Sequence, residues 1–98
     1  MPKGYWLVSG DVSDPEGYKA YQAANAAPLK EYGARFLVRG GQSRNPEGKA
    51  RSRAVVIEFP SYQAALDCSQ SAGYQAARAL RPGRADLDFV IVEGYDAP

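Results

Sequence analysis

Two polar side chains interrupt apolar runs of this chain and are its first candidates for chemistry. Arg39 ends one run and is followed by Gly40 and Gly41, so an anion could approach the backbone beside a guanidinium. Glu58 lies between two apolar residues of another run, where a half-buried carboxylate requires a partner. Glu58 is therefore a candidate general base or ligand anchor. The alternative is an ordinary ion pair with Arg39 or Arg53 across neighbouring strands.

The residue types that are missing exclude several mechanisms. The sequence contains no histidine and a single cysteine, Cys68. Ser-His and Cys-His nucleophile systems and histidine-based metal sites are thus excluded. We expect no metal and no cofactor, and any catalysis would use the remaining polar groups. Cys68 falls on the apolar side of a predicted helix, which favours an inert buried thiol over a nucleophile.

Tyrosines and arginines recur in the predicted helices. The tyrosines of these stretches are Tyr18, Tyr21, Tyr32, Tyr62 and Tyr74. They could line a pocket with their hydroxyls as donors, or they could fill the core with their hydroxyls at its rim. Three arginines follow at the end of the last helix, Arg78, Arg81 and Arg84. Cations are favoured at a helix C-terminus, so we interpret these three as solvated side chains.

The elements that must position these residues occur in the same order twice. Each half has a β-rich run, a turn, an Ala- and Tyr-rich helical stretch and a second β-rich run. The predicted strands are Tyr5–Val12, Arg35–Gly40, Arg53–Phe59 and Asp88–Gly94. Alternation along the second strand places Phe36 and Val38 on one face and Arg39 on the other. A polar loop, Gly41–Ala50, is expected to bring Arg39 and Glu58 within side-chain reach on adjacent antiparallel strands.

Helix signals complete the prediction. Asp14 and Ser61 are the expected N-caps. Pro28 lacks an N–H and predicts a kink or break in the first helix. Ser71-Ala72-Gly73 predicts an interruption that divides the second helical stretch in two.

These elements predict one domain, residues 1–98, of the α+β class. The expected architecture is a ferredoxin-like βαββαβ fold, a four-stranded antiparallel sheet with helices on one face. Apolar residues occupy both faces of the strands, although helices cover only one. Soluble monomers rarely expose such a patch. We therefore expect a second copy to pack on the open face, the alternative being that a few of these residues are simply exposed.

Charge and hydropathy restrict the partners. Twelve Lys and Arg residues nearly balance eleven Asp and Glu residues, which argues against a nucleic-acid binder. Binding of nucleic acid through the basic loop is the weakest alternative, because that loop has no stacking aromatic side chain. The chain has no signal-peptide pattern and no run long enough to cross a membrane, so no membrane association and a cytoplasmic location are expected.

Five stretches of the chain resemble a family of small, mostly bacterial proteins, the domain-of-unknown-function family 1330. They are Tyr5–Trp6, Asp11–Tyr18, Tyr32–Gly41, Val56–Ser61 and Ser71–Gln75. The resemblance implies a ferredoxin-like fold that pairs as a dimeric α+β barrel, and it implies no established activity. The wider group includes cofactor-free monooxygenases, muconolactone-isomerase-like enzymes and haem-degrading enzymes. The absence of histidine separates this chain from the haem-degrading ones.

The resemblance also favours particular site residues. Trp6 and Tyr18 match family positions near the first strand and helix, and the Arg39-Gly40-Gly41 motif gains weight from the match. Our interpretation is a homodimer that binds, or converts without a cofactor, a small organic ligand in a cleft between sheet and helices. The alternative is a non-catalytic dimerisation or ligand-sensing module. Whether the protein is an enzyme stays open at this point.

Overall fold

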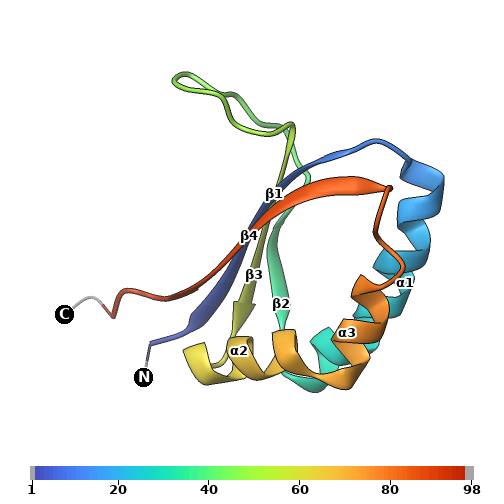
Figure 1. Cartoon of the computed structure of the whole chain (residues 1–98). Coiled ribbons are helices and arrows are strands. Elements are labelled where there is room, and N and C mark those ends of the chain that lie inside the picture. The colour runs from blue at the N-terminus through green and yellow to red at the C-terminus, as the bar shows by residue number, and fades with distance from the viewer. Residues whose placement is uncertain (1, 97–98) are drawn as a thin grey trace.

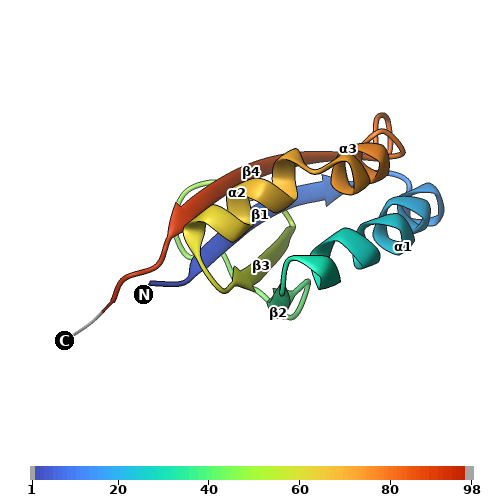
Figure 2. The ribbon, with the colours of Figure 1, turned by 90° about the horizontal axis from the view of Figure 1, so that it is seen from below.

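The computed structural model describes residues 2–96, so Met1, Ala97 and Pro98 of the expected domain lie outside the described residues. Its elements are β1 (Gly4–Val12), α1 (Pro15–Glu31), β2 (Arg35–Arg39), β3 (Arg53–Phe59), α2 (Tyr62–Gln70), α3 (Ala72–Arg78) and β4 (Ala85–Glu93). The strands form one antiparallel sheet in the order β2-β3-β1-β4, with the helices on one side (Figures 1 and 2). The expected α+β ferredoxin-like fold is confirmed.

Helix α1 begins as expected but continues through its proline. The Asp14 carboxylate accepts a hydrogen bond from the Gly17 N–H at 3.1 Å, which caps the helix. Of the kink or break expected at Pro28, the break is wrong, because α1 is one 17-residue helix that ends only at Glu31. Pro28 lies in the last turn, and its carbonyl accepts hydrogen bonds from the Tyr32 N–H and the Cys68 thiol. Few helical hydrogen bonds follow the proline, so its missing N–H costs little there.

The second helical stretch is divided at Ser71, as expected. Ser71 has extended backbone angles, φ −66° and ψ 149°, which no helix can accommodate. Its hydroxyl donates to the Cys68 carbonyl at 2.7 Å and accepts from the Tyr74 N–H at 3.2 Å. One serine therefore ends α2, begins α3 and lets the two helices follow different directions over the sheet.

The densest packing lies under α2. Trp6 and Phe59 from the sheet are at most 1% exposed, as are Ala65 and Cys68 from the helix. Gly4 allows this approach, because a Cβ there would come within 2.6 Å of the Tyr62 Cα. Small side chains on α2 thus bring the helix close to the aromatic side chains of β1 and β3.

A bulge in β2 changes the predicted faces of that strand. Phe36 is opposite Ile57, but Val38 is opposite Val56, so the register shifts between them. Phe36 packs against the core, whereas Val38 is 41% exposed on the other face. The expectation that Phe36 and Val38 share a face is therefore wrong. The extra residue also turns Arg39 to the helix side, where its guanidinium lies 4.1 Å from the Phe36 ring centroid.

The face of the sheet away from the helices is apolar along its middle. Leu7, Val38, Val90 and Val92 are exposed on it, and we call this surface the open face. Polar clusters lie near its two ends, Tyr5 with Glu58 at one and Arg51 with Asp88 at the other. An apolar centre between polar ends is the usual composition of a protein interface. Among residues 2–96, none of the helices is long and apolar enough to span a bilayer.

Candidate functional site

The two polar residues singled out in the sequence do not meet. Arg39 is opposite Val55 in the sheet, whereas Glu58 is opposite Arg35. The expectation that Arg39 and Glu58 lie within reach of each other is wrong, because the register and the bulge put them on opposite faces. Glu58 binds Arg35 at 3.5 Å instead, and its other oxygen accepts a hydrogen bond from the Tyr5 hydroxyl at 3.0 Å. That hydrogen bond, followed by burial, raises the pKa of Tyr5.

Trp6 and Tyr18 are both buried on the helix side of the sheet. Trp6 is 1% exposed, and its indole N–H donates to the Ala65 carbonyl at 2.9 Å. It therefore has no free donor for a ligand. Tyr18 is 7% exposed and its ring centroid lies 5.2 Å from that of Tyr21. Burial raises the pKa of the Tyr18 hydroxyl, so it stays protonated at neutral pH.

The two glycines after Arg39 differ in their surroundings. Gly40 has φ +67°, a conformation that side chains other than glycine rarely adopt, and a Cβ there would lie 2.7 Å from the Arg53 Cζ. The Gly40 position thus makes room for the Arg53 side chain, whose Nε is buried without a hydrogen-bond partner among the described residues. Gly41 has no heavy atom within 4 Å of such a Cβ.

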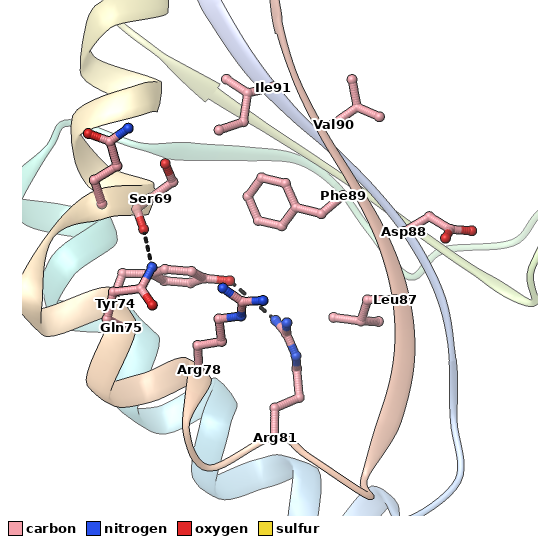
Figure 3. A pocket seen from close by; sticks show the side chains of 11 residues that line it. Ser69, Tyr74, Gln75, Arg78, Arg81, Leu87, Asp88, Phe89, Val90 and Ile91 are labelled. Atoms are coloured by element: carbon pink, nitrogen blue, oxygen red, sulfur yellow. Dashed lines mark hydrogen bonds between the residues drawn. The ribbon is translucent and has the colours of Figure 1, made fainter.

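A cleft opens between α3 and β4, on the helix side of the sheet (Figure 3). It has a volume of about 650 Å³, within the usual size of small-molecule sites. Leu87, Phe89 and Ile91 form its wall on β4. Asp88 and Val90 point to the other side of the same strand (Figure 3). Asp88 binds Arg51 there at 2.9 Å. The strand alternation therefore gives the cleft an apolar wall without an inward carboxylate.

Polar groups converge on the opposite wall of this cleft. The Tyr21 and Tyr74 hydroxyls lie 2.9 Å apart, and the Arg81 guanidinium donates to the Tyr74 hydroxyl at 3.3 Å. The Arg81 guanidinium also lies 5.0 Å from the Tyr21 ring centroid, a cation–π contact. Tyr74 is only 2% exposed, and burial raises its pKa, so its hydroxyl is a neutral donor at pH 7.

Arg78 completes this wall. Both Arg78 and Arg81 line the cleft, and Figure 3 shows their side chains reaching into it from α3 and the turn after it. Within residues 2–96, neither guanidinium has an acidic partner, whereas Arg84 binds Asp14 at 2.6 Å. The sequence interpretation treated all three arginines alike, as solvated helix-end cations. The signal it missed is that Arg81 lies beyond the end of α3, in a turn closed by backbone hydrogen bonds to Arg78 and Arg84.

The described part of the chain has no group of histidine, cysteine or carboxylate side chains arranged to hold a metal ion. Cys68 is fully buried, and burial raises its pKa to about 11, so its thiol is protonated at neutral pH. The chemistry that this site offers is therefore that of two guanidinium groups, the neutral Tyr74 phenol, the hydroxyl and amide side chains of α2 and α3, and an apolar wall.

Solved structures with the same fold come from several bacteria. RPA0582, a protein of unknown function from Rhodopseudomonas palustris, is 14% identical, with a TM-score of 0.78 over 98% of this chain and 85% of its own. SnoaB, a cofactor-independent oxygenase from Streptomyces nogalater, is 10% identical, with a TM-score of 0.63 over 99% and 97% of the two chains. A dimeric protein of unknown function from Bacteroides fragilis, with a ferredoxin-like fold, is 16% identical, with a TM-score of 0.58 over 93% and 95%.

At these identities, the likeness shows the fold alone. No curated protein matches the chain. The family assignment rests on the sequence, since the family described as "Domain of unknown function (DUF1330)" matches residues 3–95. The residue stretches that resemble this family thus belong to a match along nearly the whole chain, and the chain is a member of DUF1330.

Proposed function

We propose that this protein is a homodimer that binds a small organic ligand in the cleft between α3 and β4. The observation that carries the proposal is the pairing of Arg78, Arg81 and the Tyr74 hydroxyl with an apolar wall of β4 in a space of about 650 Å³. Small-molecule sites typically combine an apolar lining with a few convergent polar groups. No cofactor enters the proposal.

The open face supports the dimer. Leu7, Val38, Val90 and Val92 are each between 38% and 54% exposed and lie on neighbouring strands. A second copy packed sheet to sheet would remove this apolar surface from water. The Bacteroides fragilis neighbour, described as dimeric, shows that this fold is compatible with pairing.

Light scattering after size-exclusion chromatography tests the dimer. The wild type is expected at twice the chain mass of 10.6 kDa. Val90→Glu puts a charge at the middle of the open face and is expected to cost about 3 kcal/mol or more, or a hundredfold in the dissociation constant. The matched control is Leu80→Glu, an exposed leucine outside the sheet. A wild-type monomer at micromolar concentration would contradict this part of the proposal.

A ligand screen by thermal shift tests the cleft. The screen uses neutral, cationic and anionic fragments on the wild type, Arg81→Gln and Phe89→Ala. Fragments that stabilise the wild type but neither folded variant support the cleft. Arg39→Ala and Glu58→Gln are included, because the ligand role predicted for Arg39, Gly40, Gly41, Glu58, Trp6 and Tyr18 stays a prediction that the same screen addresses. Equal stabilisation of all variants would remove the cleft from the binding site.

The alternative is a non-catalytic dimerisation module. Such a module needs only the open face, and its helix–sheet layer would be packed shut from end to end. The cleft beside α3 favours the ligand-binding function instead. Incubating each binding fragment with the protein in air, followed by mass spectrometry, distinguishes binding from conversion without a cofactor.

A further inference from the structure

We infer that the ligand of this cleft is a small planar carboxylate, with its carboxylate on Arg78, Arg81 and Tyr74 and its ring against Phe89 and Leu87. This inference rests on the proposed ligand-binding function and names the chemical class of the ligand.

The charges of the cleft are uncompensated. The ion pairs within residues 2–96 are formed by Lys19, Arg35, Arg51 and Arg84, and the cleft arginines form none. Arg81 is half-buried, Arg78 is exposed, and both line the same cleft (Figure 3). Two neighbouring cations repel each other until an anion lies between them. A guanidinium fork matches the two oxygens of a carboxylate, which makes a carboxylate a suitable counter-ion.

The hydroxyl pair adds a directed donor. Tyr21 is 6% exposed, and its hydroxyl has one partner among the described residues, the Tyr74 hydroxyl. Either of the two hydroxyls can be the donor of this hydrogen bond. The Tyr74 oxygen already accepts from Arg81. In the arrangement where Tyr21 is the donor, both acceptor positions of the Tyr74 oxygen are used, and the Tyr74 proton can donate to a ligand oxygen.

The facing wall selects the rest of the ligand. Leu87, Phe89 and Ile91 are partly buried, and they present aliphatic and aromatic surface opposite the arginines. A planar ring can stack against Phe89 while its carboxylate reaches the guanidinium groups. A small inorganic anion would use only the arginines and would leave the apolar wall exposed to water. The volume of about 650 Å³ suits an acid with one or two rings.

The test compares matched probes by nuclear magnetic resonance titration of the amide signals of the intact protein. The probes are 2-naphthoate, its neutral counterpart 2-naphthamide, and inorganic phosphate, all at one fixed ionic strength. We expect 2-naphthoate to bind about tenfold or more tightly than 2-naphthamide, since hydrogen bonds to a charged group are the stronger ones. Its largest shifts should fall on the amides of α3 and of Leu87, Phe89 and Ile91.

Three variants locate the carboxylate. Arg78→Gln and Arg81→Gln are each expected to weaken 2-naphthoate binding about tenfold, and Tyr74→Phe about fivefold, with little effect on 2-naphthamide. The control is Arg44→Gln, which removes an exposed arginine of the loop between β2 and β3. Retained amide spectra show that each variant is folded. If Tyr74→Phe does not fold, the two arginine variants and the probe comparison still decide the question.

The outcomes separate the inference from the function on which it rests. Equal binding of 2-naphthoate and 2-naphthamide in the cleft would overturn the carboxylate inference and leave the ligand-binding function standing. If phosphate bound as tightly as 2-naphthoate and left the Phe89 amide signal unshifted, the inference that the ligand carries a planar ring would be overturned. If neutral, cationic and anionic fragments all leave the cleft amides unshifted, the proposed function itself fails.

Discussion

The two ends of the helix–sheet layer share one sheet but differ in how they are filled. Under α2, Ala65 and Cys68 lie directly on Trp6 and Phe59, and all four are at most 1% exposed. Beside α3 there is a cleft of about 650 Å³ instead. Helix α2 packs on β1, β3 and β4, whereas α3 packs chiefly on α1. Ser71 is the point where one arrangement changes into the other.

Side-chain size and polarity explain the difference. Small residues allow α2 to approach the sheet, so the interface is dry and tightly packed. Along α3 and the turn after it, Tyr74, Arg78 and Arg81 place large polar heads toward β4, and charged heads require water or an anion. One end of the layer is therefore tightly packed, and the other keeps an open cleft with polar side chains.

The largest expected effect is at the packed end. Phe59→Ala removes a side chain that is 0% exposed, so the free energy of unfolding should fall by about 3–5 kcal/mol. Leu80→Ala, at a leucine that is 46% exposed, should cost less than about 1 kcal/mol. Urea denaturation followed by circular dichroism measures both. A small loss for Phe59→Ala would mean that the α2 end is less tightly packed than its burial indicates.

A second substitution tests how closely α2 approaches the sheet. Gly4→Ala places a Cβ within 2.6 Å of the Tyr62 Cα, so backbone must move, at a cost of about 1–3 kcal/mol. The matched change, Gly41→Ala, meets no atom within 4 Å and should stay within about 0.5 kcal/mol of the wild type. Similar urea denaturation midpoints for the two variants would contradict the close approach of α2 to the sheet.

Most of the fold follows from local signals in the sequence. Apolar runs, the caps at Asp14 and Ser61, and the Ser71 interruption predict the order and kind of the elements. The exceptions depend on context. Pro28 is tolerated because the helix ends one turn later, and the bulge in β2 depends on pairing with β3, which no local pattern in β2 contains.

The site was less predictable for the same reason. Whether Arg39 meets Glu58 depends on register, and a one-residue shift sends a side chain to the other face. Arg78, Arg81 and Arg84 look alike in the sequence, but Arg84 pairs with Asp14, the N-cap of α1. Only the tertiary structure shows which arginines are left to face β4. The sequence allowed the tyrosines either to line a pocket or to fill the core. Tyr74 does both, since it is buried and still lines the cleft.

Alkaline pH probes both ends of the layer together. The pKa of the Cys68 thiol is raised by burial from 9.0 to about 11, and burial also raises that of Tyr74. Between pH 9.0 and about 11 the unfolded chain loses the Cys68 proton and the folded chain keeps it, whereas for Tyr74 the difference begins near its ordinary pKa of 10.0. Stability is therefore full below the unfolded pKa and falls as pH rises, by up to about 1.4 kcal/mol per pH unit for one proton.

Cys68→Ala separates the two contributions. The variant should be less stable at neutral pH, because a fully buried side chain is shortened, but its stability should fall less steeply at alkaline pH. The remaining slope belongs to Tyr74, together with Tyr5 and Tyr18, whose pKa values are also raised. Urea denaturation at a series of pH values measures both slopes. If the stability of Cys68→Ala falls as steeply with pH as that of the wild type, the Cys68 thiol does not cause the loss of stability at alkaline pH.

The smallest expected effect is electrostatic and lies in the cleft. Arg78→Gln removes one of the two cations that line the cleft and have no acidic partner among the described residues. Because their repulsion is relieved, the free energy of unfolding should rise by about 0.5 kcal/mol at low salt. The gain should vanish between about 0.01 M and about 0.15 M salt, because screening shortens the range of the repulsion from about 30 Å to about 8 Å.

Comparing Arg78→Gln with Arg44→Gln at each salt concentration cancels the effect of salt on the surface ion pairs, which both variants retain. A salt-independent difference would show that the two guanidinium groups do not repel each other. The cleft would then lack the concentrated positive charge that makes its end of the layer different from the packed one.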